Sequence, residues 1–184
     1  MKSRKGTDTA RVASILTRLE EAYPKAECAL VHKNAWQLLV ATILSAQCTD
    51  VRVNKVTPDL FRKYPTVKDF ACVRNEVLEQ DIHSTGFFRN KAKSIIGAAN
   101  KVLSDFGGRV PRTMDELLTL PGVARKTANV VLGTAFGIAS GVVVDTHVAR
   151  ISGRLDLTPR QKTPEKIERG LMRILLCRPV WKPL

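Results

Sequence analysis

Helical periodicity of the apolar residues is the feature that most constrains the fold of this chain. The longest example covers residues 88–106, where apolar side chains recur at the spacing of one helix face, and Gly107-Gly108 marks its end. Only Val142-Val143-Val144 is typical of extended backbone, and three residues do not make a sheet. The sequence therefore predicts an all-α fold. The same periodicity predicts shorter helices at residues 12–19, 36–44 and 167–175.

A proline-glycine turn between two predicted helices is the most distinctive local feature. Thr113 and Glu116 have capping-box spacing, which predicts that a short helix starts there. The segment Leu120-Pro121-Gly122-Val123-Ala124 then turns the chain into a second helix over residues 125–136. Gly122 permits a positive φ and a close approach of phosphate, and the first N–H groups of the second helix favour an anion. On these residues alone an ordinary loop is the simpler interpretation.

The charge of the chain predicts attraction to a polyanion. The chain contains thirty Lys and Arg residues and seventeen Asp and Glu residues, which gives a formal net charge of +13. A merely solubilising positive surface explains the same numbers equally well.

The cysteines give no sign of a metal or redox site. They are scattered and contain no C-x-x-C pair, so we expect buried free thiols in a reducing cytosol: Cys28, Cys48, Cys72 and Cys177. The basic start is not followed by a signal-type apolar run, and no stretch approaches the about 20 apolar residues of a membrane span. We therefore expect a cytoplasmic protein with no membrane partner.

Several segments together resemble one family, the endonuclease III branch of the helix-hairpin-helix DNA glycosylases. The resemblance covers about residues 10 to 175 in order and spacing. Its motifs are Ser45-Ala46-Gln47-Cys48-Thr49-Asp50, Gly86-Phe87-Phe88-Arg89-Asn90-Lys91-Ala92, Leu120 to Asn129, and Val144-Asp145-Thr146-His147-Val148. It implies base-excision repair of duplex DNA that carries damaged pyrimidines or abasic sites. The expected enzyme acts as a monomer, associated with the nucleoid if bacterial.

The resemblance also implies a division into two lobes. A six-helix central lobe is expected at residues 29–140, with the helix-hairpin-helix at about 113–136. Residues 1–28 and 141–184 are expected to form a discontinuous, truncated second lobe. Family members continue to a C-x6-C-x2-C-x5-C loop that holds a [4Fe-4S] cluster, and the cysteines of this sequence lack that spacing. We therefore expect no cofactor in this chain.

Two residues carry the chemistry that the resemblance implies. Lys126 is assigned the attack on C1′ of the damaged nucleotide, which makes the enzyme both glycosylase and lyase. The helix N-terminus and neighbouring Arg125 disfavour its ammonium form, although a helical lysine is ordinarily just a solvated charge. Asp145 is assigned the role of essential carboxylate, and from its residue type alone it is expected to be a helix N-cap. His147 is expected to be a satisfied helix residue.

DNA contacts are implied at further positions. The resemblance assigns Gln47 to the space left by the extruded base and the loop around Phe87 to a wedge in the opposite strand. From the residues alone, Gln47 is a polar helix end and Phe87 a core residue beside Phe88. The hairpin contacts are assigned to Leu120, Gly122, Val123, Ala124, Arg125 and Thr127. The sequence contains several basic residues between 89 and 112, Lys91 among them. They either contact the phosphate backbone or form an ordinary solvated helix face.

Ala124 departs from the family pattern, because it replaces the second glycine of the G-x-G hairpin. A requirement for positive φ at this position would carry a cost, and we expect the hairpin to survive it. Three rival functions remain open at this level: a truncated protein that binds abasic DNA without cleaving it, a monofunctional glycosylase, and a helical protein-interaction module.

Overall fold

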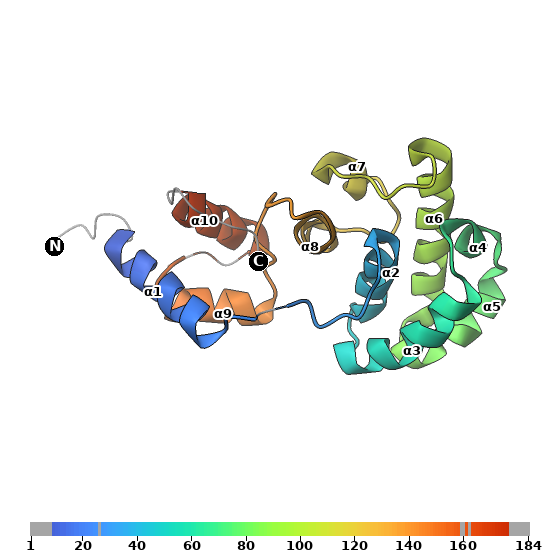
Figure 1. Cartoon of the computed structure of the whole chain (residues 1–184), viewed down its shortest axis with the longest axis horizontal. Coiled ribbons are helices and arrows are strands. Elements are labelled where there is room, and N and C mark those ends of the chain that lie inside the picture. Colours follow the sequence, from blue (N-terminus) through green and yellow to red (C-terminus); the bar gives the residue numbers. More distant parts are fainter. Residues whose placement is uncertain (1–8, 26, 159–160, 162, 177–184) are drawn as a thin grey trace. The chain divides into compact units, whose positions relative to one another are not determined.

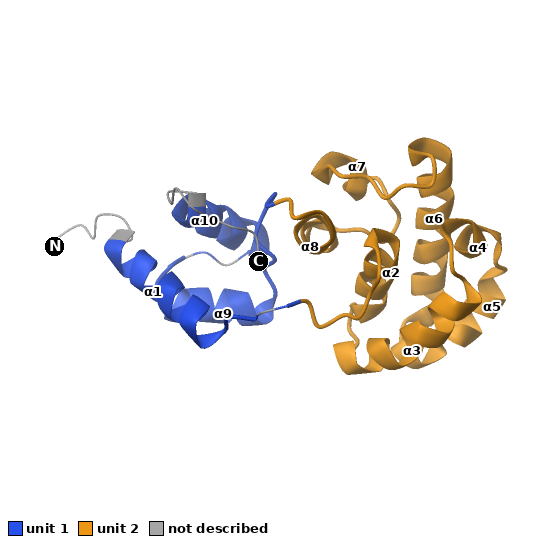
Figure 2. Ribbon diagram, viewed as in Figure 1, with its two compact units in different colours: residues 1–27, 139–184 blue, residues 28–138 orange. Residues whose placement is uncertain are grey.

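The computed structural model of the chain describes residues 9–25, 27–158, 161 and 163–176, and all their regular elements are helical (Figure 1). The predicted all-α fold is confirmed. None of the helices in these ranges has the length and apolar character needed to span a bilayer. The chain divides into two compact units, one of residues 28–138 and the other of residues 1–27 with 139–184 (Figure 2).

The unit of residues 28–138 is built around one buried helix. Helix α2 contacts α3, α6 and α8 and has fully buried side chains around its whole circumference, as expected for a central core helix. The helices of this unit are α2 Ala35–Ser45, α3 Asp50–Lys63, α4 Val67–Cys72, α5 Asn75–Asp81, α6 Phe88–Phe106, α7 Met114–Leu118 and α8 Arg125–Phe136, with a 3₁₀ turn, η1, at His83–Thr85.

Apolar periodicity in the sequence does not predict helices α3, α4 and α5, because local capping and packing define them. Thr49 caps α3, and Thr66 forms a full capping box with Asp69 at the start of α4. Helix α3 contains Pro58 in its interior, a residue that normally ends a helix. Helices α4 and α5 are too short to repeat an apolar pattern.

Helix α6 is the long element against which α4 and α5 pack (Figure 1). Its buried face carries Ile95, Ala98, Ala99 and Val102, and it ends where Gly107 adopts a left-handed φ of 58°. The bounds predicted from periodicity are confirmed.

The unit formed by both ends of the chain contains α1 Thr9–Ala22, α9 Thr146–Arg154 and α10 Pro164–Leu176. Its core is small and centres on Val144, Ile167 and Leu171. The Arg11 guanidinium of α1 donates to the carbonyl oxygens of Leu155 and Asp156 at 2.7 and 3.1 Å, which ties α1 to the end of α9.

Candidate active site and DNA-binding surface

The hairpin turn between α7 and α8 is held by its own backbone and by α6. The Val123 N–H donates to the Leu120 carbonyl at 3.1 Å, which closes the turn around Pro121 and Gly122. Gly122 has φ +75°, and a Cβ there would lie 2.5 Å from Cβ of Ser94 on α6. Two independent constraints, conformation and space, therefore require glycine at this position.

Ala124, by contrast, has no need of glycine. It is the N-cap of α8 with φ −96° and ψ 170°, an extended conformation open to any residue. The cost considered for replacing the second glycine therefore does not arise, and the hairpin forms as expected. No side chain caps α8 at Ala124, and the first-turn amides of a helix have no acceptor within the helix itself. This helix start is suited to receiving an anion.

The side chains of the hairpin divide into buried and exposed ones. Leu120 and Val123 are buried, and their N–H groups donate to the carbonyls of Leu117 and Leu120, at 3.1 Å each. Ala124 and Arg125 are exposed and Thr127 is half-buried. The predicted hairpin contacts thus fall on two buried and on three more accessible positions, and they stay a prediction.

Lys126 lies in the first turn of α8, directly after this turn. Its side chain is exposed, and it makes no salt bridge within the part of the chain that the structure describes. An amine in this position can reach an external electrophile next to a phosphate bound at the start of α8. This is the arrangement that a nucleophilic lysine requires.

Asp145 is the N-cap of α9, as its residue type predicts. Its carboxylate accepts a hydrogen bond from the Val148 N–H at 2.7 Å, and the side chain is partly buried. One carboxylate oxygen is thus committed to the helix. His147 is exposed and is hydrogen-bonded to Arg150 on α9 at 3.3 Å, which agrees with the expectation of a satisfied helix histidine.

Gln47 and Phe87 share an unusual backbone conformation. Their φ angles are 52° and 48°, and Asp156 is the one other non-glycine residue with positive φ in the described ranges. Both side chains are exposed, Phe87 by 63%, so the interpretation of Phe87 as a core residue is wrong. Left-handed backbone at non-glycine residues is often found where a functional site imposes it.

Lys91 is also placed differently from the expectation. It is only 5% exposed, and its Nζ donates to the carbonyl oxygens of Leu44 and Thr85 at 2.8 Å each, so it cannot track phosphates. Burial lowers the pKa of this amine below its ordinary value. The sequence contains no sign that this lysine differs from exposed Lys93 on the same helix.

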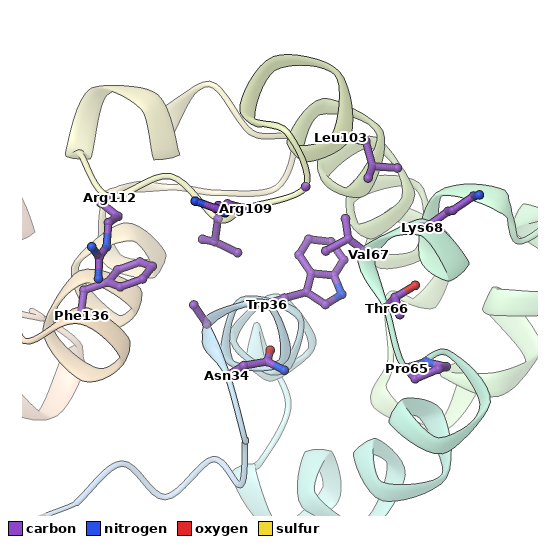
Figure 3. A pocket seen from close by; sticks show the side chains of 13 residues that line it. Asn34, Trp36, Pro65, Thr66, Val67, Lys68, Leu103, Arg109, Arg112 and Phe136 are labelled. Atoms are coloured by element: carbon purple, nitrogen blue, oxygen red, sulfur yellow. The ribbon is translucent and has the colours of Figure 1, made fainter.

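A groove of about 660 Å³ lies at the opposite end of α2 and α6 from Gln47 and Phe87 (Figure 3). Its walls are largely apolar and include Trp36 near the start of α2 and Leu103 near the end of α6. The exposed Arg112 guanidinium lies over the ring of Phe136 at 4.8 Å. The lining of the groove includes neither the hairpin turn nor Gln47 and Phe87.

The described residues offer no set of side chains that fits a [4Fe-4S] cluster. Cys28, Cys48 and Cys72 are free, and no group of three or more His, Cys, Asp or Glu residues within the described ranges could hold a metal. Cys177 lies outside those residues. The expectation of buried thiols is wrong for Cys28 and Cys72, which are exposed.

Comparison with known proteins places this geometry in a family. A model of the HhH-GPD superfamily of base excision DNA repair proteins matches residues 40–176. Endonuclease III of Synechocystis is 58% identical over 172 residues, which cover 94% of this chain and 78% of the relative. The chain belongs to the endonuclease III family. Endonuclease III of Bacillus subtilis is 49% identical, with 86% of this chain and 72% of the relative covered.

Solved structures of endonuclease III agree with this membership. An endonuclease III–DNA covalent intermediate, trapped as an estranged-adenine complex, matches with a TM-score of 0.86 and 46% identity over 92% of this chain and 79% of that chain. A thermostable thymine-DNA glycosylase, at 22% identity and a TM-score of 0.72, shares the fold. The protein is thus a base-excision DNA repair enzyme of the glycosylase and abasic-site lyase class, and the alternatives of a binding-only remnant and an interaction module are not favoured.

Proposed function

We propose that this protein removes oxidised pyrimidines from duplex DNA and cleaves the resulting abasic site through a Schiff base on Lys126. The observation that carries the proposal is the exposed Lys126 in the first turn of α8, immediately after the Pro121-Gly122 turn and a helix start without a side-chain cap. One structural relative was trapped as a covalent intermediate with DNA, which supports a nucleophilic mechanism in the family.

The reaction proceeds in two stages, removal of the base at C1′ and then β-elimination of the 3′ phosphate. The neutral Lys126 amine attacks C1′, the bond from C1′ to the base breaks, and the base leaves with the electron pair and takes up a proton. The Nζ–C1′ adduct loses a proton, and the C1′–O4′ bond then breaks. O4′ keeps the electron pair of that bond and takes up a proton, while C1′ and Nζ form a protonated Schiff base. Loss of a proton from C2′ expels the 3′ phosphate in β-elimination, and water finally hydrolyses the Schiff base to release Lys126.

We assign to Asp145 the stabilisation of positive charge and the proton transfers in these reaction steps. Positive charge develops on the sugar as the base leaves, and a carboxylate stabilises that charge. The N-cap bond to Val148 occupies one carboxylate oxygen and fixes the orientation of the side chain, which leaves the other oxygen for the sugar. The capping and catalytic roles of Asp145 are therefore compatible.

The DNA contacts divide by task. The backbone of the hairpin from Leu120 to Ala124 would bind the phosphates, with Arg125 and Thr127 beside it. Gln47 would fill the space of the extruded base, and Phe87 would enter the opposite strand, where an aromatic ring can stack. Both are exposed, as these roles require.

We also propose the setting in which the enzyme acts. Its partner is duplex DNA with damaged pyrimidines or abasic sites, bound by a cytoplasmic monomer that associates with the nucleoid if the source is bacterial. The side chains of this chain carry out the chemistry without a resident cofactor.

Borohydride trapping on duplex DNA with thymine glycol or an abasic site tests the proposal. The wild-type chain should give a covalent adduct and a strand break. Lys126→Arg keeps the positive charge and removes the nucleophilic amine, so it should bind the DNA and give no adduct. An adduct formed equally by Lys126→Arg would refute the assignment of the nucleophile. DNA binding by a folded wild-type chain without any adduct would refute the enzymatic proposal.

A further inference from the structure

The lysine of α6 that the mechanism does not use is buried in an unusual way. Lys91 is 5% exposed and forms hydrogen bonds to two backbone carbonyls, not to a carboxylate. A buried ammonium group loses its hydration, and two neutral acceptors compensate this loss only in part. An apolar side chain of similar length would fill the same space without that loss. The ammonium is therefore expected to serve a purpose other than packing.

The two carbonyls belong to the segments that carry Gln47 and Phe87. Leu44 lies in the last turn of α2, just before Gln47, and Thr85 ends η1, just before Phe87. The carbonyls at a helix C-terminus lack donor partners within the helix, and the lysine supplies a donor to each segment. One side chain thus bridges two loops that are far apart in the sequence.

Each loop contains left-handed backbone shortly after the bridged carbonyl, at Gln47 after Leu44 and at Phe87 after Thr85. Gln47 and Phe87 have positive φ, a conformation that persists only where surrounding structure enforces it. At Phe87, the N-cap of α6, no side-chain hydrogen bond to the first amides of the helix enforces this conformation. Lys91 donates to a carbonyl just before each of the two loops, at Leu44 and at Thr85.

The same helix supports the hairpin. Ser94 lies about one turn beyond Lys91 on α6 and contacts Gly122, and Gly97, about one turn further, lies against the ring of Pro121. Helix α6 thus holds the phosphate-binding turn, while its first turns hold both loops through Lys91.

We propose that Lys91 is a positioning residue for lesion extrusion, whose ammonium holds the Gln47 loop (residues 45–48) and the Phe87 loop (residues 86–88) in one fixed arrangement. The two side chains then enter the DNA together, one filling the gap and the other entering the opposite strand. This inference rests on the proposed function for what Gln47 and Phe87 do. The bridge itself is independent of that function.

The test compares Lys91→Met, which keeps the length of the side chain and removes its donors, with two controls. Lys55→Met removes the same charge from an exposed position on α3. Phe70→Leu lowers stability through the aromatic cluster of Trp36, Phe61 and Tyr64. Hydrogen exchange should become faster in residues 45–48 and 86–88 together, and selectively there, in Lys91→Met. Lys55→Met should leave both segments unchanged, and Phe70→Leu should raise exchange without this selectivity.

Activity separates positioning from general stability. Single-turnover excision of thymine glycol from duplex DNA should fall by up to about 100-fold in Lys91→Met, the scale expected for small misplacements. Cleavage of an abasic site in single-stranded DNA needs no extrusion and should be unchanged, as should both activities of Lys55→Met. A 2-aminopurine opposite the lesion should lose the fluorescence change that the wild-type chain induces on binding.

Three results would overturn the inference. The first is unchanged protection of both loops in Lys91→Met. The second is wild-type duplex excision by that variant. The third is an equal loss of duplex and single-strand activity, as Phe70→Leu would give on partial unfolding. A wild-type chain without activity would instead refute the proposed function, and hydrogen exchange would still decide on the bridge.

A double-mutant cycle covers the case in which Lys91→Met does not fold. Gln47→Ala and Phe87→Ala alter only exposed side chains, so the variants should fold. If the loops act as one unit, their effects on duplex excision should be strongly non-additive. Simple multiplication of the two effects would contradict the inference.

Discussion

Gly122→Ala is the substitution whose consequence the structure defines most closely. The new Cβ would lie 2.5 Å from Cβ and 2.8 Å from Oγ of Ser94, at a backbone φ of +75°. Cβ of Ser94 is fixed to the α6 backbone and cannot rotate away. The variant therefore combines a conformational penalty with a steric overlap.

The expected loss of stability is the sum of these two contributions. An L side chain in the left-handed region costs about 1–2 kcal/mol. Forcing an additional methyl group into a packed contact costs about 1–3 kcal/mol. The free energy of unfolding should thus fall by about 2–5 kcal/mol, a large part of the about 5–15 kcal/mol typical of a folded protein.

Ser94→Gly provides the matched second site. In the wild-type chain it should cost about 0.5 kcal/mol, because glycine is a weaker helix former than serine. In the Gly122→Ala background it removes the overlapping Cβ, so the double variant should be more stable than Gly122→Ala alone. The same substitution is thus destabilising in one background and stabilising in the other.

Urea denaturation followed by far-ultraviolet circular dichroism measures all four proteins, with Gly133→Ala as a control. A Cβ at Gly133, inside α8, meets nothing within 4 Å and should add about 0.5–1 kcal/mol of stability. A Gly122→Ala loss below 1 kcal/mol, or a Ser94→Gly effect of the same sign in both backgrounds, would refute the reasoning.

Three further predictions concern helix starts. Asp145→Asn keeps the cap on Val148 and removes the charge, so stability should stay within about 0.5 kcal/mol while the single-turnover excision rate falls by about 100-fold or more. Hydrogen bonds from Thr66 lower the pKa of Asp69 below 3.8, so its stabilising effect is present above pH 3.8 and is lost as the pH falls through the folded pKa. Urea titrations should then show wild type and Asp69→Asn converging in acid. Ala124→Asp should cap α8 and stabilise the chain by about 1 kcal/mol, yet weaken duplex binding in a fluorescence anisotropy titration, because its carboxylate competes with phosphate.

The sequence predicted most accurately those features that depend on residues close together in the chain, such as helix ends and caps. The end of α6 at Gly107, the bounds of α8 and the cap at Asp145 all follow from short-range rules, and they are confirmed. Helix α3 could not be predicted in the same way, because Pro58 argues against a helix and tertiary packing overrides it.

The exposure of single side chains is set by tertiary contacts and could not be predicted. Lys91 and Lys93 are alike in sequence, and only the fold directs one of them to the carbonyls of Leu44 and Thr85. Phe87 and Phe88 are likewise adjacent aromatic residues, and the left-handed backbone of Phe87 exposes one ring while Phe88 packs against the core. Burial of this kind is a property of contacts distant in sequence.

Helix starts connect these observations to function. Side chains cap α2, α3, α4, α7 and α9, while α5, α6 and α8 begin without a side-chain cap. Two of these three uncapped starts, at Phe87 and Ala124, lie in the segments assigned to DNA. A capping side chain at Ala124 would stabilise α8 by about 1 kcal/mol and would occupy the amides that a phosphate needs. The local stability absent at Ala124 is supplied by packing of the turn on α6, through Gly122 against Ser94 and Pro121 against Gly97. Contacts with α6 thus hold the hairpin in place without a side-chain cap at Ala124. The proposed binding of the DNA backbone at the start of α8 needs an uncapped helix start of this kind.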